Sequence, residues 1–520
     1  GLKHLFKHRW IAWSLLGVTV IMLVVMMNTT KTGLIPDEDM GTVFINVSTP
    51  AGSTLEQTNK SIERITQVIK RIPEMEGNSV IAGFSKLGGQ TANGGMIIVR
   101  LKNWSERKGK GQDINSVIGK VMAYTKDIKS ASIFAFAQPT IMGYSSSNGI
   151  ELYVQDHEGG TTEKLMANTN NFIAALQKRP EISQAYTTYS IQYPQYVVDV
   201  DAAQCIRYGI SPTSVLDVLN GYIGGNYASN FNAFSKLYRV MVQASPDKRL
   251  DKDALDNIYV KTNSGEMAPV GQFIKLTKTY GPQSLIRFNL YNSISVNAMP
   301  ASGYSTGDVI KAISEVSKNT LPKGYGYEYT GMTREESSSS SNTVMIFAIC
   351  IVFIYLILCA LYESLFIPLA VMLSVPFGLL GSFIFANIFG LSNNVYMQVG
   401  LIMLIGLLSK TAILLTEYAS DRRKQGMTII AAAMSAAGVR LRPILMTALC
   451  MTVGMIPLAL SSGAGANGDM SLALGVIGGM TVGTVALLFM VPVFFIAFQT
   501  LQEKLMPARK HEIEILEETK

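Results

Sequence analysis

A lysine stands inside a long apolar segment of this 520-residue chain. Lys410 lies well within Val399–Ala419, whose sequence is VGLIMLIGLLSKTAILLTEYA. An ammonium near the centre of a bilayer costs at least about 2.5–3.5 kcal/mol, and such residues usually face a bundle interior and serve transport. Lys410 is roughly ten residues, or about 15 Å of helix, from Asp421 at the segment end, which is too far for comfortable extension to water. We therefore expect Lys410 to be a functional, interior-facing ammonium.

The counter-ion of Lys410 is expected to lie outside this chain. A buried ammonium needs a carboxylate partner, because an unpaired one is driven towards its neutral form. The apolar segments offer few carboxylates: Glu417 lies two turns from Lys410 on the same face, and Glu363 and Asp469 lie at segment boundaries. None of them is placed to neutralise Lys410 at the middle of a span.

Two further polar features lie in another apolar segment. Thr447 follows Pro443 by one helical turn and can form hydrogen bonds. Arg440 and Arg442 stand at the start of that segment. Positive residues at such a place also anchor the topology, which is the favoured interpretation for Arg442 and an equal alternative for Arg440.

Six segments are long and apolar enough to cross a bilayer, for which about 20 residues are needed. They are residues 11–28, 343–362, 365–388, 396–419, 443–461 and 472–498. The whole chain is 48% hydrophobic and only 16% charged, whereas soluble domains have about 25% charged residues. The first segment has the basic start of a signal peptide, but its length and the polar residues 28–31 after it favour a membrane anchor. The sequence predicts a membrane α-helical bundle of six spans.

The distribution of Lys and Arg orients these spans. Positive residues gather before the first span, between the fourth and fifth, and after the sixth: Lys3, Lys7 and Arg9; Arg422, Arg423, Lys424, Arg440 and Arg442; Lys504, Arg509 and Lys510. With six spans these stretches fall on one side, which is the cytoplasm, together with residues 1–10 and the tail 499–520. The opposite side receives residues 29–342.

Residues 29–342 alternate between strand and helix patterns. Thr42–Ser48 is β-branched and apolar, and the turn Pro50–Thr54 caps a helix over 55–72. Further strands are expected at 79–85, 96–101, 132–136, 150–154, 195–200, 293–299 and 326–329, and further helices at 114–128, 162–177 and 306–318. Such units build α+β domains with one helical face, here a first subdomain over about 37–142 and a second over about 143–200 plus 291–331.

Residues 201–290 interrupt this pattern and indicate an inserted subdomain. A helix capped by Ser211-Pro212 runs to Leu219, and Gly221–Asn232 is expected to be a loop rich in Gly, Asn and Tyr, with an extended hairpin near 224–235. Short strands follow at 238–244, 258–261 and 272–277. The serines at 337–341 fit either a flexible linker or the start of a helix.

The remaining composition favours neither a metal site nor a disulfide framework. Three of the four cysteines lie in apolar segments, and only Cys205 lies in a polar region. No Cys/His cluster has metal-ligand spacing. We interpret the net charge of +7 as charge carried by loops, so nucleic acid is not an expected partner. No cofactor is expected.

Several motifs make the chain resemble a known family over essentially its whole length. They are the segment GLLSKTAILLTEYA around Lys410, RLRPILMT (440–447), IPDEDMG (35–41), PAGST (50–54), FAFAQP (134–139), YTGM (329–332), ALYESLFIPLAVML (360–373) and FMVPVFF (489–495). The chain resembles the C-terminal half of a resistance–nodulation–division (RND) transporter of the hydrophobe/amphiphile efflux type found in Gram-negative inner membranes.

This resemblance implies a proton-driven multidrug exporter, a secondary transporter and not an enzyme. It implies porter subdomains of ferredoxin-like βαβ type, outside the membrane in the periplasm, and an inserted docking subdomain at 201–290. By position, Lys410, Arg440 and Thr447 match the family's proton-relay residues.

The resemblance also implies a substrate pocket. Phe134 and Phe136 match aromatic residues of that pocket, and Ile98 matches a further pocket position that is usually aromatic. The segment Phe84–Gly89, with Lys86 and Leu87, matches the loop between two drug pockets, and Lys86 replaces what is often Phe. Residues two apart on a strand face the same side, so the two phenylalanines can form one apolar wall; core packing is the alternative.

Complete members of the family are twice as long. The resemblance therefore implies an N-terminal half as partner, which supplies the paired aspartates that Lys410 lacks here. It further implies a homotrimer of complete protomers, a periplasmic adaptor protein and an outer-membrane channel, with hydrophobic small molecules and protons as the transported species.

Other functions remain open at this point. A heavy-metal or lipid exporter of the same superfamily is one alternative, although most of the 26 methionines lie in apolar spans where Met is ordinary filler. A non-transporting receptor or scaffold with the same fold is an alternative of another class, and Lys410, Arg440 and Thr447 argue against it. No P-loop, nucleophile elbow or HExxH motif indicates an enzyme.

Overall fold

The computed structural model describes residues 2–86, 89–145, 149–249, 251–301 and 303–505. Leu87 and the last part of the expected tail, residues 506–520, lie outside the described residues. Contacts divide the chain into two compact units, one made of residues 1–189 and 285–520 and the other of Ser190–Ser284.

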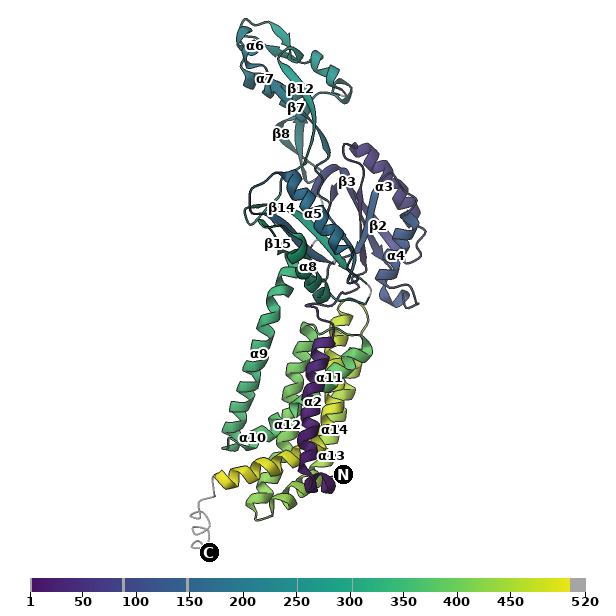
Figure 1. Ribbon diagram of the computed structural model, residues 1–520. Coiled ribbons are helices and arrows are strands. Elements are labelled where there is room, and N and C mark those ends of the chain that lie inside the picture. Colours follow the sequence, from purple (N-terminus) through teal and green to yellow (C-terminus); the bar gives the residue numbers. More distant parts are fainter. Residues whose placement is uncertain (1, 87–88, 146–148, 250, 302, 506–520) are drawn as a thin grey trace. The chain divides into compact units, whose positions relative to one another are not determined.

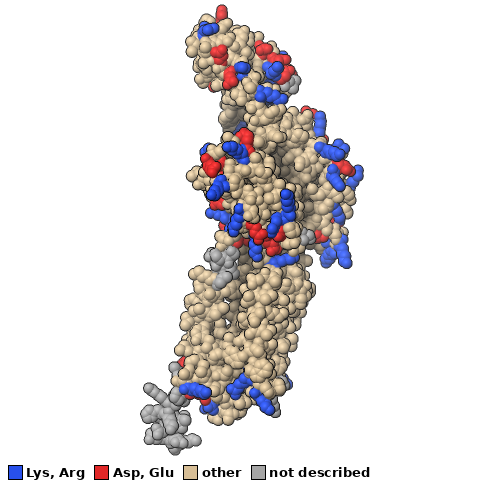
Figure 2. Space-filling model, in the orientation of Figure 1, with Lys and Arg blue, Asp and Glu red and all other residues tan. Residues whose placement is uncertain are grey.

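Six helical segments in the described part are long and apolar enough to cross a membrane (Figure 1). They are α2 (Arg9–Thr29), the Met345–Tyr362 part of α9 (Gly331–Tyr362), α10 with α11 (Ile367–Met372 and Val375–Phe389), α12 (Val395–Lys424), α13 (Ile429–Ala459) and α14 (Ala466–Leu505). A short helix, α1 (Leu2–Lys7), precedes them. On the face shown in Figure 2, charged side chains are nearly absent from the middle of the bundle and frequent at its lower end.

Several helix limits differ from those expected. Helix α13 begins at Ile429 and contains Pro443, whereas the sequence placed the start of this span at Pro443 itself. Membrane helices tolerate an internal proline because neighbouring groups can satisfy the carbonyl that it frees. The serine run belongs to helix α9, so of its two interpretations the linker is wrong.

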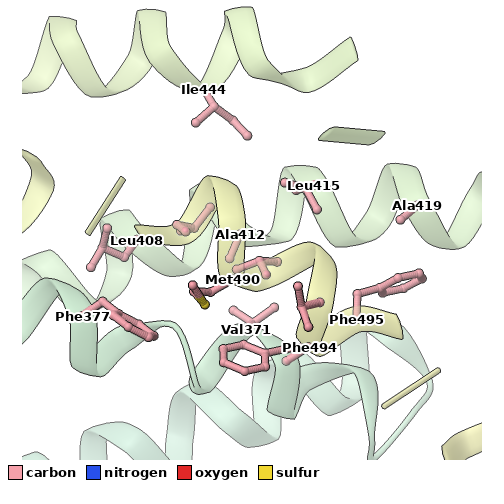
Figure 3. Packing of buried hydrophobic residues seen from close by; sticks show 14 of the residues in the cluster. Val371, Phe377, Leu408, Ala412, Leu415, Ala419, Ile444, Met490, Phe494 and Phe495 are labelled. Carbon is pink, nitrogen blue, oxygen red and sulfur yellow. The ribbon is translucent and has the colours of Figure 1, made fainter. Parts of the chain in front are cut away.

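The bundle core is built from close helix contacts. On α12 the buried residues Leu408, Ala412, Leu415 and Ala419 recur at helical spacing and face the residues of α14 (Figure 3). Helices α11 and α14 approach at glycines: a Cβ atom on Gly381 would lie 2.5 Å from the carbonyl oxygen of Gly478. Small residues permit this backbone contact in membranes, and it fixes α14 against its neighbours.

The first sheet contains four antiparallel strands in the order β2-β3-β1-β4. Its elements are β1 (Thr42–Ser48), α3 (Leu55–Ile69), β2 (Met75–Ser85), β3 (Gly89–Leu101), α4 (Ile114–Thr125) and β4 (Ser132–Ala137). Thr54 forms a capping box with Gln57 at the start of α3. Both helices pack on one face of the sheet. Val43, Ile45 and Ile97 of the sheet form one buried core with side chains of α3 and α4.

A second sheet repeats this order of elements: strand, helix, strand, strand, helix, strand. They are β5 (Ile150–Asp156), α5 (Thr162–Leu176), β6 (Ile182–Tyr186), β14 (Tyr291–Pro300), α8 (Thr306–Thr320) and β15 (Tyr325–Tyr329). Strand β14 pairs with β5 and β6, β5 pairs with β15, and the short β13 (Arg287–Phe288) adds to the edge. Strand β6 was not expected from the sequence.

The unit Ser190–Ser284 has its own core around Cys205, Val215 and Phe273. It contains β7 (Tyr193–Val200), α6 (Ala202–Arg207), α7 (Pro212–Leu219), β8 (Asn226–Ala233), β9 (Lys236–Val242), β10 (Tyr259–Lys261), β11 (Met267–Pro269) and β12 (Ile274–Gly281). Because β7 pairs with β12 over its whole length, the unit begins at 190 rather than at 201. The expected loop at Gly221–Asn232 is wrong in its second half, whereas the hairpin expected near 224–235 is confirmed, since β8 pairs with β9.

Candidate functional site

Lys410 and Thr447 line one cavity in the helix bundle. The cavity has a volume of about 130 Å³ and is lined by Leu407, Lys410, Thr411, Leu414, Thr447, Cys450, Met451 and Met480. Three helices contribute: α12, α13 and, through Met480, α14. The structure therefore brings together two of the three residues proposed for a relay.

The spacing along each helix explains this arrangement. Leu407, Lys410, Thr411 and Leu414 stand at i, i+3, i+4 and i+7 and so share one face of α12. The buried stripe through Leu408 and Ala412 occupies another face of the same helix (Figure 3). Because that stripe packs against α14, the other face of α12, which carries Lys410, lines the cavity beside α13.

Lys410 is exposed in this chain. Among the residues that the structure describes, it forms no ion pair, and no carboxylate lines its cavity. The nearby Glu417 is exposed as well, and Glu503 on α14 pairs with Arg423, their atoms Oε1 and Nε being 2.8 Å apart. Lys410 therefore lies beside an open cavity that it shares with the Thr447 hydroxyl, but it has no anionic partner in the described part of the chain.

Arg440 lies elsewhere on α13 and does not line the cavity. Its guanidinium carbon lies 5.0 Å from the centroid of the Tyr418 ring, and its Nε atom is buried without a hydrogen-bond partner among the described atoms. Arg422 contacts the same ring, also at 5.0 Å, and its Nη2 donates to the Tyr418 hydroxyl at 2.6 Å. A guanidinium over an aromatic face is a favourable cation–π contact, so Tyr418 orients Arg440.

The role of Tyr418 was not expected from the sequence. The only signal was an aromatic residue two turns after Lys410, and which ring meets Arg440 depends on how α12 and α13 pack. The packing of two helices cannot be predicted from the sequence of either helix alone.

The predicted pocket residues form an aromatic cluster on the first sheet. Strand register places Phe44 on β1 opposite Ile98 on β3 and opposite Phe136 on β4. Phe134 stacks on Phe136 with ring centroids 5.6 Å apart. Phe84 packs against the same cluster. Because side chains alternate along a strand, these residues lie on the face opposite helices α3 and α4.

Residues from the second sheet complete the cluster. The Tyr186 ring lies 4.6 Å from Phe134, and Met299 also packs against the cluster. Phe136 is only 1% exposed and Phe134 is half-buried. Phe136 therefore lies at the buried centre of the cluster, and Phe134 lies nearer the surface. Phe44, Tyr186 and Met299 were not expected, because their place depends on strand order and on the second sheet.

Lys86 brings a positive charge to the edge of this cluster. Its Nζ lies 4.2 Å from the centroid of the Phe44 ring. Burial lowers the pKa of Lys86, while the Glu151 carboxylate opposes that change. Burial also raises the pKa of the Tyr186 hydroxyl, and Glu151 adds to the rise. The neighbouring Leu87, the last expected pocket residue, lies outside the described residues.

In the part of the chain that the structure describes, no three His, Cys, Asp or Glu side chains are grouped closely enough to hold a metal ion. The arrangement in the bundle suits movement of a proton or of a lysine side chain. The cluster on the sheet suits contact with apolar and aromatic molecules.

Comparison with known proteins identifies the family. The sequence model of the AcrB/AcrD/AcrF family matches residues 1–499. The multidrug/solvent efflux pump membrane transporter MepB of Pseudomonas putida is 34% identical over 493 residues, which are 94% of this chain and 46% of MepB. The multidrug resistance protein MdtF of Escherichia coli is 33% identical over 483 residues, which are 92% of this chain and 46% of MdtF.

A third relative, the antibiotic efflux pump membrane transporter ArpB of Pseudomonas putida, is 35% identical over 472 residues, 90% of this chain and 45% of ArpB. The chain thus spans about half the length of the curated relatives it matches. With six apolar helices among its described residues and a β-rich region, the chain belongs to the AcrB/AcrD/AcrF family of resistance–nodulation–division transporters.

Proposed function

We propose that this chain is the C-terminal half of a transporter that exports hydrophobic or amphiphilic compounds in exchange for protons. The observation that carries the proposal is the shared cavity of Lys410 and Thr447 between α12 and α13. A lysine at membrane depth needs a carboxylate partner, and none lines this cavity among the described residues. The length of the relatives supports a second half that supplies it.

The proposed mechanism is a change of partner for the Lys410 ammonium. In the resting state the ammonium pairs with carboxylates of the N-terminal half. When those carboxylates take up a proton, the attraction is lost and Lys410 swings towards Thr447. The Thr447 oxygen has lone pairs free to accept a hydrogen bond from it. A local change of charge then shifts a helix bundle with two alternative packings.

Arg440 has a different proposed role. Arginine side chains are not deprotonated in proteins, so Arg440 is not proposed as a group that passes on a proton. Held over Tyr418, it supplies a fixed positive charge near the helix that carries Lys410. Such a charge favours release of the proton from the carboxylates towards the cytoplasm.

The domain and membrane assignments follow the family. We propose that the two sheets are porter subdomains in the periplasm and that residues 190–284 form the docking subdomain. The bundle lies in the bacterial inner membrane. The cluster around Phe134 and Phe136, with Ile98, Phe84, Lys86 and Leu87, is the proposed substrate contact. Complete protomers form a homotrimer that works with a periplasmic adaptor and an outer-membrane channel.

The names of the relatives support the substrate class. MepB is described as a multidrug and solvent pump and ArpB as an antibiotic pump. A wall made of aromatic rings binds such apolar molecules without strict directional demands.

Co-expression tests the half-transporter proposal. The chain is produced alone, together with a matching N-terminal half, and as Lys410→Met with that half, and drug export and membrane protein level are measured in each case. We expect stable insertion in all three and export only in the second. Proton-coupled export by the chain alone would contradict the proposal.

A further inference from the structure

Glu38 binds the first turn of helix α14. Its Oε1 accepts a hydrogen bond from the Gly468 backbone N–H at 2.7 Å, and its Oε2 accepts one from the Asn467 N–H at 3.1 Å. The Asn467 side-chain amide donates to the carbonyl oxygen of Asp37 at 2.5 Å. Glu38 is only 4% exposed. The first N–H groups of a helix have no partner within it, and a carboxylate there also gains from the helix dipole.

The next residue, Asp39, is bound to the first sheet domain. Its carboxylate accepts from Arg107, whose Nη1 lies 3.0 Å from Oδ2 and whose side chain is 2% exposed. Its carbonyl oxygen accepts from the Trp104 indole N–H at 2.9 Å. Arg107 in turn donates from Nε to the Lys102 carbonyl directly after β3, at 2.7 Å. The consecutive residues Glu38 and Asp39 thus bind different structures: Glu38 binds helix α14, and Asp39 binds the loop that follows β3 of the first sheet.

Helix α14 extends from this junction to the cavity of Lys410. Met480 on α14 lines that cavity, and it stands twelve residues after Gly468, or about 18 Å of helix. The contact of Gly478 with Gly381 on α11 is too close for any side chain. The continuous helix α14 thus connects the residue that lines the cavity, Met480, with the residue that Glu38 binds, Gly468.

We propose that Glu38 is a positioning residue that couples events at the Lys410 cavity to the sheet domain, through α14 and the Glu38–Asp39 junction. This inference rests on the proposed function. In this proposal the Glu38 carboxylate transmits motion in addition to stabilising the end of α14. Loss of the link should therefore let protons pass without the matching export of drug.

The test uses the complete transporter that contains this chain, reconstituted in vesicles with a pH gradient. Glu38→Gln retains one oxygen acceptor, and Glu38→Ala retains none. Glu106→Gln is the matched control, because Glu106 is exposed on the loop that carries Trp104 and Arg107. Drug export, proton flux and protein level are measured for each variant.

We expect Glu38→Ala to lower the amount of drug exported per proton by about tenfold, the scale of losing a hydrogen bond to a charged group. Glu38→Gln should be intermediate, and Glu106→Gln should match the wild type. A purely structural role would lower export and proton flux in proportion to protein level, leaving their ratio unchanged. That result would overturn the proposal, as would wild-type coupling in Glu38→Ala.

Two further outcomes are decisive. If both Glu38 variants fail to accumulate in the membrane while Glu106→Gln does accumulate, Glu38 serves folding and the coupling role is wrong. Lys410→Met is assayed beside them: wild-type export in that variant would defeat the proposed function itself, whatever the Glu38 variants show.

Discussion

Lys410 and Thr447 face the same cavity from neighbouring helices, but the Thr447 hydroxyl is engaged within its own helix. Its Oγ1 donates to the carbonyl oxygens of Pro443 and Ile444, at 3.1 and 3.0 Å. The oxygen itself remains able to accept a hydrogen bond. Thr447 is therefore suited to receive the Lys410 ammonium when that ammonium leaves another partner.

Thr447→Val tests this role of the hydroxyl. The change preserves shape and removes the acceptor, so we expect a severalfold loss of export for all substrates at normal membrane level, and recovery in Thr447→Ser. Thr481→Val is the control, since Thr481 is exposed on α14 and its hydroxyl also donates to a carbonyl of its own helix, that of Ile477 at 2.7 Å. Equal export in Thr447→Val and Thr481→Val would remove Thr447 from the mechanism.

The ring of Tyr418 should matter more than its hydroxyl. Tyr418→Phe keeps the aromatic face for Arg440, whereas Tyr418→Leu removes it, and a cation–π contact contributes about 0.5–2 kcal/mol. We expect near-normal export in the Phe variant and clearly reduced export in the Leu variant, in assays of drug efflux at equal protein level. If both variants behave alike, the ring does not position Arg440.

Phe134 and Phe136 should determine which compounds are exported. Replacing both by Ala should change resistance to some compounds and leave others nearly untouched, in a susceptibility panel read with membrane protein level. Truncation of a buried Phe costs about 3–5 kcal/mol of stability. Phe172→Ala is therefore the control, because Phe172 is fully buried in the core of the second sheet domain. Equal loss for every compound in both cases would mean that the pair only packs the core.

The sequence alone was sufficient to locate six apolar spans, because each has an apolar run of bilayer length. It set the start of α13 at Pro443 because residues 429–442 are rich in Ala and contain two arginines, which weakens the apolar signal. At Gly221–Asn232 the composition favoured a loop, and only the expected hairpin near 224–235 pointed to strand β8, which pairs with β9. Pairing and packing decide such segments.

The candidate site was predictable to different degrees. Lys410 stood out because charge is costly in a membrane. That Thr447 shares its cavity, while Arg440 meets Tyr418 instead, depends on the packing of α12 against α13. Predicting the cluster around Phe136 would have required the order of the strands in the sheet, which the sequence does not give.

Glu336 near the start of α9 should make stability depend on pH. Burial raises the pKa of its carboxyl above the ordinary value of 4.5, the Thr306 hydroxyl opposes this through a hydrogen bond of 2.6 Å, and the Asp37 carboxylate raises it further. The folded chain thus binds this proton more tightly than the unfolded chain does. The resulting stability is fully present below pH 4.5 and is lost as the pH rises through the raised pKa.

Thermal unfolding measured from pH 4.5 to neutrality checks this dependence. Glu336→Gln should flatten the curve and raise the melting temperature at neutral pH. Glu335→Gln, an exposed neighbour on the same helical turn, should follow the wild type. A Glu336→Gln curve parallel to the wild type would exclude this carboxyl as the titrating group.

In the proposed mechanism, export depends on the charge of Lys410. Lys410→Met keeps much of the volume and removes the charge. Breaking a buried ion pair can cost about 3–5 kcal/mol, but an orphaned carboxylate can take up a proton instead, so the protein should still fold. Lys410→Arg should also fail, because a planar guanidinium does not replace a compact ammonium.

The most direct measurement is drug efflux by Lys410→Met in the complete transporter, read together with its level in the membrane. The proposed mechanism predicts normal protein level, normal trimer assembly and drug binding, and no export of any substrate. Export near the wild-type rate would contradict it, since Lys410 would then be only a charge that extends to the membrane surface.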